Sequence, residues 1–402
     1  GKIDCSAAMD HVRKIIYTVY QTHTPEKLEK DGIDVLQGAP AFLNDHQLQL
    51  NGKTISFDKC VVCTGSSPFI PPIEGLENIS YLTNQNFFSL TKFPKSMLVL
   101  GGGAIGAELS SALNRLGVQV TIIERGPRIL PYDDAELVGM ICDKMICEGI
   151  NIETNMTATR ANQQNGKITL TCLDDRLSEK SFTADSLLVA TGRTPNIEGL
   201  DLQKAGVKTT RKGIVIDDTM CTTAKNIYAA GDVAGPYLFS HMAWHQASTA
   251  VRNAFIPFFK KKLRYNNVSW VAFTAPEFAS AGLTEEKARK KYGDNICVYR
   301  QEYKNLDRAM ISQRTYGMLK CICDKRGYII GVHILGERAG EIMHELQLAK
   351  TKGIKLADIQ SVIHSYPTYS ELIWAVAKKA YIDRLEKNMF VRLAKKFFVK
   401  KS

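Results

Sequence analysis

The chain has 402 residues, with 52 Lys or Arg against 41 Asp or Glu and a formal charge of +11. Its 45% apolar and 23% charged residues are typical of a globular protein of two or three domains, which excludes disordered, collagen-like and coiled-coil classes. No apolar run approaches the ~20 residues that a membrane span needs. Basic residues concentrate in 378–401, so the rest is nearly neutral and no nucleic-acid partner is expected. Ten cysteines are too few for a secreted disulfide scaffold, which favours a reducing, cytoplasmic location.

The opening segment is predicted to contain one helix followed by short strands. Apolar residues at helical spacing indicate a helix over 9–30. Short alternating segments predict strands at 33–37, 41–43 and 47–50. The dipeptide Asn51-Gly52 predicts a hairpin turn. The apolar run 60–63 predicts a buried strand that ends at the turn-rich Thr64-Gly65-Ser66-Ser67-Pro68.

A strand–loop–helix–strand unit follows from residue 96. Apolar strands at 97–100 and 118–123 flank a helix at 107–116, and this order predicts a parallel sheet covered on both faces. The sequence is therefore that of a βαβ unit in a doubly wound α/β domain.

The loop inside this unit, Gly101-Gly102-Gly103-Ala104-Ile105-Gly106, has the GxGxxG spacing of a dinucleotide site. Gly101 permits the tight turn, Gly103 lets a diphosphate approach the backbone, and Gly106 lets the helix pack on the strand. The free N–H groups at the helix start would then hold the phosphates.

Glu124 ends the second strand, 23 residues after Gly101. A carboxylate there can accept a hydrogen bond from the ribose 2′-hydroxyl and would repel a 2′-phosphate. NADH is therefore preferred over NADPH, although Arg125 is adjacent.

Two further apolar strands run into glycine turns, at 187–190 before Gly192-Arg193 and at 226–230 before Gly231-Asp232. A carboxylate at the end of a parallel strand can hold a sugar or polyol hydroxyl, and it can equally cap the helix that follows. From about 267 onward, strands at 271–273, 296–301, 317–323 and 328–335 precede helices at 339–352 and 369–395. That order predicts a separate α+β domain.

Six motifs in this order resemble the class I pyridine nucleotide-disulfide oxidoreductases, the family of mercuric reductase and dihydrolipoamide dehydrogenase. They are the Thr64–Pro68 turn, the Gly101–Glu108 loop, Ala190-Thr191-Gly192-Arg193, Ala230-Gly231-Asp232, Phe273-Thr274-Ala275-Pro276-Glu277 and Ser365-Tyr366-Pro367-Thr368-Tyr369-Ser370-Glu371.

The resemblance implies interleaved FAD- and NAD-binding Rossmann-like domains and a C-terminal dimerisation domain. The implied bounds are 1–90 and 214–266 for the FAD domain, 91–213 for the NAD domain, and 267–402 for the dimerisation domain. The family's first glycine loop and its Cys-x4-Cys redox disulfide do not occur in residues 1–60. The chain is therefore expected to be a family member without its first stretch, or a degenerate homologue with an incomplete FAD domain.

The resemblance also implies roles for single residues. Asp232 would bind the ribityl chain of FAD, and the helix near Met242-Ala243 would point its N-terminus at the flavin. Glu108 would contact the nicotinamide carboxamide and Ile105 would pack near that ring, while Arg193 would lie between the two nucleotide sites. The implied cofactor contacts also include Thr64, Gly65, Gly192 and Gly231.

The last motif would bring Tyr366 and Glu371 from one subunit to the flavin of the other. The family's usual acid–base histidine stands where this chain has Tyr366, and His364 lies two residues earlier. Tyr366 is either a group that faces the acceptor, as the resemblance to mercuric reductase implies, or a packing residue in a turn.

The function implied is a homodimeric, FAD-dependent NAD(P)H oxidoreductase that passes hydride through the flavin to a disulfide or other small acceptor. The alternative is a catalytically incomplete nucleotide-binding or membrane-associated homologue. No cysteine follows Cys323, so mercury reduction is not favoured, and no metal site is expected.

The remaining cysteines and the basic tail have simpler interpretations. Cys142 and Cys147 would lie on different faces of a helix over 134–148 and could not form a disulfide. Cys60 and Cys63 are expected to be small buried hydrophobes, and Cys321 and Cys323 to project side by side from one strand. The tail 381–401 has apolar residues at fourfold spacing among Lys and Arg, typical of a helix on a membrane surface or of one packed on a partner subunit.

Overall fold

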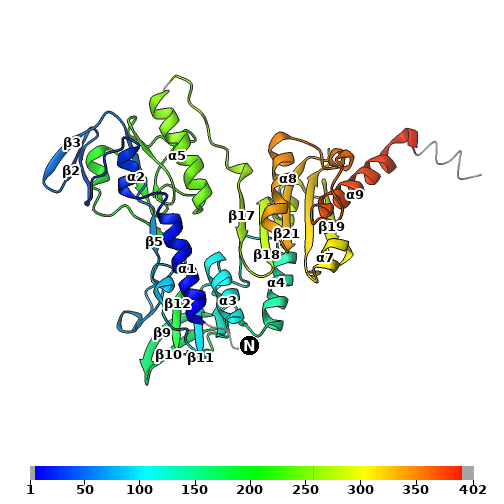
Figure 1. The fold of residues 1–402 in the computed structure, drawn as a ribbon, viewed down its shortest axis with the longest axis horizontal. Coiled ribbons are helices and arrows are strands. Elements are labelled where there is room, and N and C mark those ends of the chain that lie inside the picture. The colour runs from blue at the N-terminus through cyan, green and yellow to red at the C-terminus, as the bar shows by residue number, and fades with distance from the viewer. Residues whose placement is uncertain (1–4, 257, 392–402) are drawn as a thin grey trace, which may run out of the picture. The chain divides into compact units, whose positions relative to one another are not determined.

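The computed structural model describes residues 5–256 and 258–391. The chain divides into two compact units, each built from segments that are distant in the sequence (Figure 1). Unit 1 consists of Gly1–Pro72, Ser80–Pro94 and Leu188–Tyr265, and unit 2 consists of Ile73–Ile79, Lys95–Leu187 and Asn266–Ser402. In the part of the chain that is described, no helix has the length and apolar character to cross a bilayer.

Unit 1 begins with two helices, α1 (Cys5–Tyr20) and α2 (Pro25–Lys30). The prediction of a single helix over 9–30 is therefore wrong. Pro25 is the first residue of α2 and holds Thr24 in an extended conformation (φ −70°, ψ 154°). A helix cannot continue through that conformation because the proline ring excludes the preceding residue from helical geometry.

A three-stranded antiparallel sheet follows, formed by β1 (Ala41–Asn44), β2 (Gln47–Leu50) and β3 (Lys53–Ser56). The predicted turn between the last two is confirmed, with Asn51 at φ 50° and Gly52 at φ 79° as a type I′ hairpin requires. The predicted strand at 33–37 is wrong, because these described residues belong to no sheet.

The rest of unit 1 surrounds a short parallel pair, β4 (Cys60–Val62) and β16 (Ile227–Ala229), with α5 (Ser240–Phe255) packed against it. Two antiparallel pairs complete the unit: β5 (Ser66–Pro68) with β13 (Arg193–Pro195), and β14 (Thr209–Thr210) with β15 (Gly213–Ile214). Residues from two of its segments, including Val62, Leu202 and Ile227, share one buried core.

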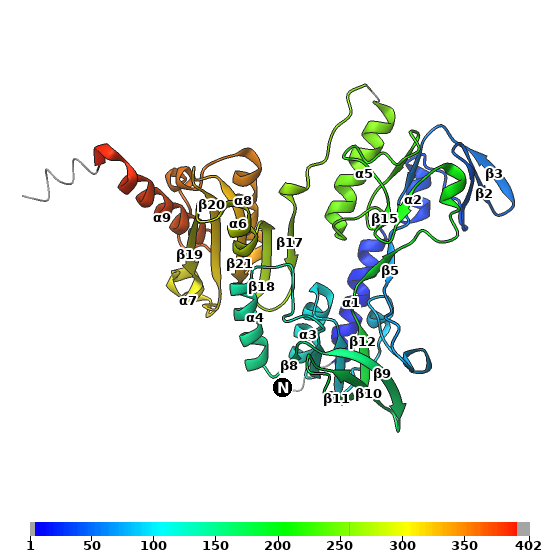
Figure 2. The same cartoon turned by 180° about the vertical axis from the view of Figure 1, so that it is seen from behind.

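Unit 2 contains the predicted βαβ unit. Its four-stranded sheet has the order β12 (Ser186–Val189), β6 (Ser96–Leu100), β7 (Gln119–Ile123), β8 (Asn151–Glu153), and the β6–β7 and β7–β8 pairs are parallel (Figures 1 and 2). The helices are α3 (Ala104–Arg115) and α4 (Ala135–Cys147). An antiparallel sheet of β9 (Thr157–Gln164), β10 (Lys167–Leu173) and β11 (Glu179–Ala184) was not predicted.

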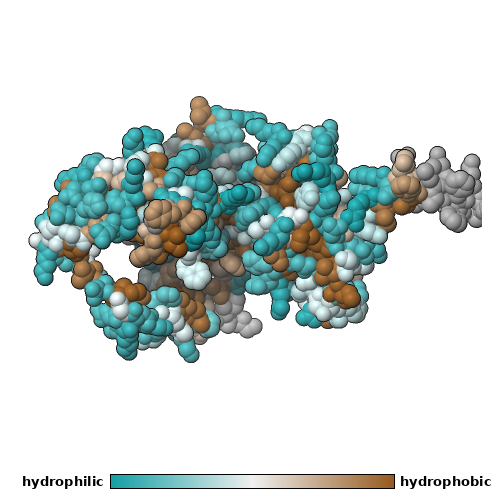
Figure 3. Space-filling model, turned by 90° about the horizontal axis from the view of Figure 1, so that it is seen from above, coloured by the Kyte–Doolittle hydropathy of each residue, from teal (hydrophilic) through white to brown (hydrophobic). Residues whose placement is uncertain are grey.

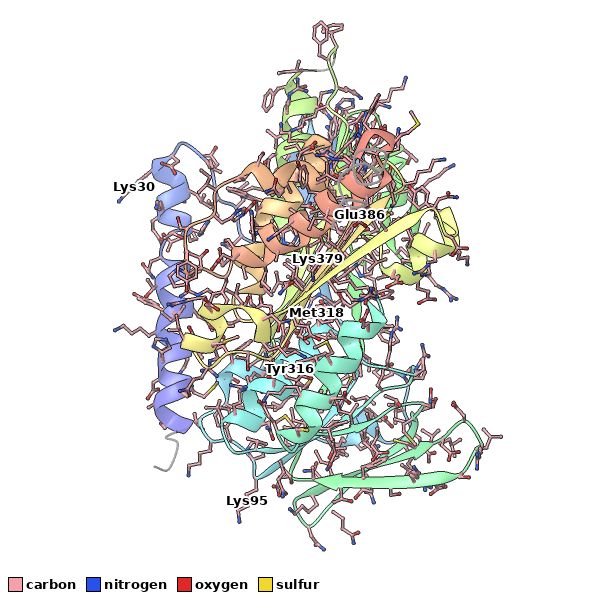
Figure 4. The ribbon with its side chains drawn as sticks, turned by 90° about the vertical axis from the view of Figure 1, so that its right-hand side faces the viewer. Lys30, Lys95, Tyr316, Met318, Lys379 and Glu386 are labelled. Carbon is pink, nitrogen blue, oxygen red and sulfur yellow. The ribbon has the colours of Figure 1, made fainter. Side chains whose placement is uncertain are left out.

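The C-terminal part of unit 2 is the predicted α+β arrangement. Its antiparallel sheet has the order β17 (Ser269–Ala272), β18 (Glu277–Gly282), β21 (Ile329–Gly336), β20 (Met318–Asp324), β19 (Ile296–Glu302). Helices α8 (Ala339–Lys352) and α9 (Glu371–Lys387) share a buried core with one face of this sheet, and Figure 4 shows α9, which carries Lys379 and Glu386, lying across it. Short helices α6 (Glu285–Tyr292) and α7 (Asp307–Ile311) connect the strands.

The predicted helix over 369–395 ends early. Asn388 has φ −74° and ψ 123°, an extended conformation that terminates α9 at Lys387. Of the predicted tail 381–401, residues 381–387 are helical as part of α9, the helix is interrupted at Asn388, and residues 392–402 lie outside those the structure describes.

A buried ion cluster joins α4 to the other face of the antiparallel sheet. Lys320 on β20 is 2% exposed, and its ammonium lies 2.8 Å from Asp134 and 2.7 Å from both Glu136 and Glu285. Arg300 on β19 also contacts Glu136 and Glu285. These five residues, the Lys320 cluster, fix the start of α4 against β19, β20 and α6.

Candidate functional site

The glycine loop of unit 2 connects β6 to α3 in the predicted way. Gly101 has φ 106°, and its N–H donates to the carbonyl of Ile123 at 2.8 Å. A Cβ on Gly106 would lie 2.0 Å from the Gly101 carbonyl oxygen, so only glycine lets α3 approach the loop so closely. Gly103 precedes the first residue of α3, no side chain caps the helix there, and a Cβ on Gly103 would meet nothing within 4 Å.

Glu124 lies beside this loop, at the end of β7. Its two carboxylate oxygens accept hydrogen bonds from the backbone N–H groups of Gly102 and Gly126, each at 2.6 Å. The charge is therefore held next to the start of α3 by two fixed donors. Carboxylate oxygens retain further acceptor capacity, which a ribose hydroxyl can use.

Glu108 and Ile105 lie in the first two turns of α3, and both are half-buried. The Glu108 carboxylate accepts a hydrogen bond from the N–H of Phe273 at 2.9 Å. Burial raises the pKa of Glu108 above its ordinary value, and the hydrogen bond from Phe273 opposes this only in part.

In unit 1, Asp232 follows β16 and belongs to a polar network with Ser66 and Arg193. The Ser66 hydroxyl donates to the Asp232 carboxylate at 2.6 Å. Arg193 donates to the hydroxyl and carbonyl oxygens of Ser66, at 2.6 and 2.7 Å, and its Nε lies 3.4 Å from the same carboxylate. Arg193 also donates to Asn84 at 3.2 Å. The structure thus brings Asp232 and Arg193 together through Ser66, a contact that the sequence analysis did not assign.

The neighbouring turns of unit 1 are tied together by Asn196. Its side-chain amide donates to the Thr64 carbonyl, the Thr64 hydroxyl donates to the Asn196 carbonyl, and the Asn196 N–H donates to the Gly65 carbonyl. Gly192 accepts from the N–H of Phe69 at 2.9 Å. The Thr64–Gly65 turn is therefore bonded to Asn196, and the Gly192 turn is bonded to Phe69, the residue after β5.

Gly231 and the start of α5 meet at a buried glutamine that sequence reasoning missed. Gln246 accepts a hydrogen bond from the N–H of Gly231 at 2.7 Å and donates to the carbonyl of Gly235 and the hydroxyl of Tyr265. Met242 is buried, and the Ala243 side chain lies within 3.3 Å of where a Cβ of Gly231 would be. The signal that could have identified Gln246 is a polar residue at a fully buried position of a helix.

The described residues of unit 1 fit one end of an FAD molecule. Asp232 supplies a carboxylate for hydroxyl groups, and α5 begins after Phe239 with no side-chain cap, which leaves helix N–H groups for an electron-rich ring. The GxGxxG loop of the sequence lies in unit 2. Within residues 5–256, unit 1 thus offers no such loop to the FAD diphosphate.

Tyr366 lies in the loop before α9, and Glu371 is the first residue of that helix. Tyr366 is 70% exposed and donates to Asp307 on α7 at 2.8 Å, a hydrogen bond that raises the pKa of the phenol. Glu371 begins α9 and accepts from the N–H of Thr368 at 3.1 Å. The His364 side chain is only 6% exposed, and its Nε2 lies 3.1 Å from Glu345 on α8.

The nine cysteines that are described are all free thiols. Cys142 and Cys147 remain apart on α4, as predicted. Cys321 and Cys323 are buried and hydrogen-bonded to each other, which confirms that they project side by side and raises the pKa of Cys323 well above its ordinary value. Burial raises the pKa of Cys60 to about 11. Among residues 5–256 and 258–391, no group of three or more His, Cys, Asp or Glu side chains is arranged to hold a metal.

Comparisons with known proteins agree with the six motifs. Residues 6–254 match the family described as pyridine nucleotide-disulphide oxidoreductase, and residues 268–377 match the dimerisation domain of the same family. Mercuric reductase from Staphylococcus aureus is 32% identical over 373 residues, which cover 92% of this chain and 68% of that protein. Dihydrolipoyl dehydrogenase from Thermus scotoductus is 34% identical over 361 residues, 87% of this chain and 76% of that protein.

The fold also matches solved structures. The HOCl-induced flavoprotein disulfide reductase RclA from Escherichia coli superimposes with a TM-score of 0.86 at 26% identity, covering 94% of this chain and 86% of that one. The predicted fold class and family are both confirmed. The chain belongs to the class I pyridine nucleotide-disulphide oxidoreductases, a family of NAD(P)H-dependent flavoprotein enzymes.

Proposed function

We propose that this chain forms a homodimeric oxidoreductase that binds NADH and FAD and whose acceptor is a disulfide or another small electrophile. The observation that carries the proposal is the uncapped start of α3 beside Glu124, with Gly103 open to a diphosphate. The alternative is a catalytically incomplete nucleotide-binding or membrane-associated homologue.

The nicotinamide cofactor is assigned to the Gly101–Gly106 loop. The N–H groups at the start of α3 would bind its diphosphate, and the Glu124 carboxylate would accept from the ribose 2′-hydroxyl. The same negative charge disfavours a 2′-phosphate, which supports NADH over NADPH. Glu108, with its raised pKa, would accept a hydrogen bond from the carboxamide, and Ile105 would pack against the ring.

FAD is assigned to unit 1, where Thr64, Gly65, Gly192, Gly231 and Asp232 surround the end of β16. When bound, FAD supplies a two-electron carrier that accepts hydride from the nicotinamide and passes electrons to the acceptor. The chain's own part is to hold it. Ser66 and Arg193 fix the Asp232 carboxylate for ribityl hydroxyls, and Met242 and Ala243 place the N-terminus of α5 at the ring edge.

The proposed domains follow this assignment, with an FAD domain at 1–90 and 214–266, an NAD domain at 91–213 and a dimerisation domain at 267–402. Tyr366 and Glu371 are assigned to the acceptor site of the partner subunit. A phenol whose pKa is raised by Asp307 keeps its proton at neutral pH, so Tyr366 would not remove a proton from the acceptor. Its single O–H donates to Asp307, so it would have to leave Asp307 to donate a hydrogen bond to the acceptor.

Two glycine variants test the nucleotide site, because the structure separates their effects. Gly103→Ala meets no atom within 4 Å, so we expect an unchanged melting temperature and NADH binding weakened about tenfold or more by the added methyl group. Gly106→Ala places Cβ 2.0 Å from a carbonyl oxygen, so we expect loss of both stability and binding. Gly139→Ala on α4, also without close neighbours, is the control. Unchanged NADH affinity in Gly103→Ala would refute the site.

A second experiment separates the enzyme from the alternative. The protein is mixed with FAD and NADH, and NADH oxidation is followed with disulfides, quinones and metal ions as acceptors. Turnover with one of them, lost in Asp232→Asn, would support the oxidoreductase. NADH binding without flavin binding or turnover would favour the non-catalytic homologue.

A further inference from the structure

The end of α5 in unit 1 carries a group of exposed apolar side chains that the proposed catalytic roles do not use. Phe255, Ile256, Phe258 and Phe259 are 81%, 43%, 90% and 78% exposed. We call these four residues the α5 tip. Scattered exposed apolar residues are normal at a protein surface, but three nearly bare phenylalanines within five positions are not.

Hydrogen bonds hold the backbone at Phe259 and in the residues that follow the α5 tip. The exposed aromatic side chains are therefore attached to a fixed segment. Arg252 donates to the carbonyl of Phe259 at 2.7 Å. The buried Asn253 accepts from the N–H of Lys261 at 2.7 Å and donates to its carbonyl at 2.8 Å. The N–H of Leu263 donates to the Asp218 carbonyl at 2.8 Å. Figure 1 shows the chain turning back at this end of α5.

Positive charge borders the tip. Lys260, Lys261, Lys262 and Arg264 are all exposed, and we call them the basic collar. The sequence has no Asp or Glu between Asp232 and Glu277. Nearby carboxylates come from another segment, where Asp218 lies 3.0 Å from Lys262, so the collar is only partly neutralised. Figure 3 looks onto this end of α5 and shows brown hydrophobic side chains bordered by teal ones.

We propose that the α5 tip and its basic collar form a docking surface for an anionic lipid bilayer. Phenylalanine side chains enter the boundary between headgroups and acyl chains, while lysine and arginine bind the acidic headgroups. The lysine stems lie along the apolar layer and keep their ammonium groups in water. This surface goes beyond the catalytic proposal and needs neither cofactor. It is also separate in sequence from the basic tail 381–401.

The test is co-sedimentation of the full chain with vesicles of phosphatidylcholine alone or mixed with phosphatidylserine. We expect binding only to the anionic vesicles, and weaker binding at high salt. The Phe258→Ser/Phe259→Ser variant should bind at least about tenfold more weakly, because two apolar side chains are lost. The Lys260→Gln/Lys261→Gln variant should lose about 20- to 30-fold, since each lysine near an anionic surface contributes about a factor of five.

Two control variants test whether the loss of vesicle binding is specific to the α5 tip and the basic collar. Tyr132→Ser removes an aromatic side chain that is 75% exposed in unit 2, and Lys290→Gln/Lys291→Gln removes two exposed lysines from α6. Both should bind vesicles like the unaltered chain. Thermal melting should be unchanged in every variant, because all the altered side chains are exposed.

Three outcomes would overturn the proposal. The tip variants could bind vesicles as well as the unaltered chain does. Binding could instead be lost only in Lys395→Gln/Lys396→Gln, which would assign the contact to the tail. In the third outcome, the tip variants lower the molecular mass measured by ultracentrifugation without vesicles, which would show that a second copy of the chain covers the tip.

Discussion

At the scale of single residues, Glu124 shows how one side chain can serve both the fold and the ligand. Its carboxylate is fixed by the N–H groups of Gly102 and Gly126, so it keeps its position without a bound nucleotide. A pre-positioned acceptor loses little conformational entropy when a ribose hydroxyl arrives. Glu124 is therefore expected to set the preference between the two nicotinamide cofactors.

We predict that Glu124→Gln weakens NADH binding about tenfold and leaves NADPH binding equal or stronger. The amide loses one charged acceptor, worth about 1–2 kcal/mol, and no longer repels a 2′-phosphate. Titration of both cofactors, followed by nicotinamide fluorescence, measures the ratio. Glu148→Gln, which alters a surface ion pair with Arg115, is the control. Equal NADH affinity in the two variants would remove Glu124 from the ribose site.

Glu108 gives a prediction about pH. Burial raises its pKa above the ordinary value of 4.5 in the folded chain. The folded state therefore binds more protons than the unfolded state between that value and the raised pKa, and stability falls as pH rises through this window. Glu108→Gln removes the buried charge and keeps an acceptor for the Phe273 N–H. It should raise the melting temperature at neutral pH and have no such effect below pH 4.5. A variant that melts earlier at neutral pH would contradict this.

At the scale of elements, the Lys320 cluster holds α4 against strands that lie far away in the sequence. Burial alone would raise the pKa values of Asp134, Glu136 and Glu285, but hydrogen bonds from Lys320, Arg300 and Arg289 outweigh it and lower all three. These carboxylates therefore stabilise the fold above their ordinary pKa values of 3.8 and 4.5. Their contribution is lost as pH falls through the lower, folded values.

We predict that Lys320→Met destabilises the fold by about 3–5 kcal/mol at neutral pH, because Asp134 loses its cation and Glu136 and Glu285 keep only their arginine partners. The deficit should shrink at acid pH, where the carboxylates become neutral. Urea unfolding at both pH values measures this. Lys290→Met, an exposed lysine on α6, should change the free energy of unfolding by less than about 0.5 kcal/mol. A deficit that does not depend on pH would mean that lost packing, and not uncompensated charge, is the cause.

Elements with strong local signals could be predicted from the sequence. The βαβ unit, the Asn51-Gly52 hairpin and α8 (Ala339–Lys352) were found because periodicity, glycine chemistry and apolar runs coincide there. The strands β9 and β11 were missed because their sequences are largely polar and gain their order from pairing with β10. The central strand β10 does have alternating buried apolar residues, Ile168, Leu170 and Cys172, a strand pattern that was overlooked. The break between α1 and α2 depends on Pro25, whose effect was outweighed by the helical spacing around it.

The candidate site was predictable where it follows local motifs and not where it depends on distant pairing. The glycine loop and Glu124 are close in sequence, and both lie where the spacing placed them. The Ser66–Asp232 hydrogen bond joins residues 166 positions apart, and Gln246 reaches Gly231 across a helix. Tyr366 donates a hydrogen bond to Asp307, which is 59 positions away in the sequence. No periodicity or spacing within one segment encodes such contacts.

At the scale of the whole molecule, the loop before α9 carries exposed apolar side chains. Ile363 is 97% exposed, and Val362 beside it is 50% exposed. Both lie within residues 268–377, which match a dimerisation domain. The buried His364 side chain contacts the partly exposed Glu345 on α8 and so links this loop to that helix. A surface of this kind gains stability when a second copy of the chain buries it.

We predict that the protein is a homodimer and that Ile363→Glu raises the dimer dissociation constant at least about 100-fold. In a twofold interface the substitution occurs twice, and each copy replaces an apolar contact worth about 1.5–3 kcal/mol with a charge that loses water. Sedimentation equilibrium over a range of concentrations measures the constant. Leu177→Glu is the matched control, because Leu177 is 77% exposed in unit 2 but lies outside the residues that match the dimerisation domain. If the Ile363→Glu variant dimerises as tightly as the Leu177→Glu variant, the dimer interface does not include Ile363. The assignment of Tyr366 to the acceptor site of the partner subunit would then be wrong.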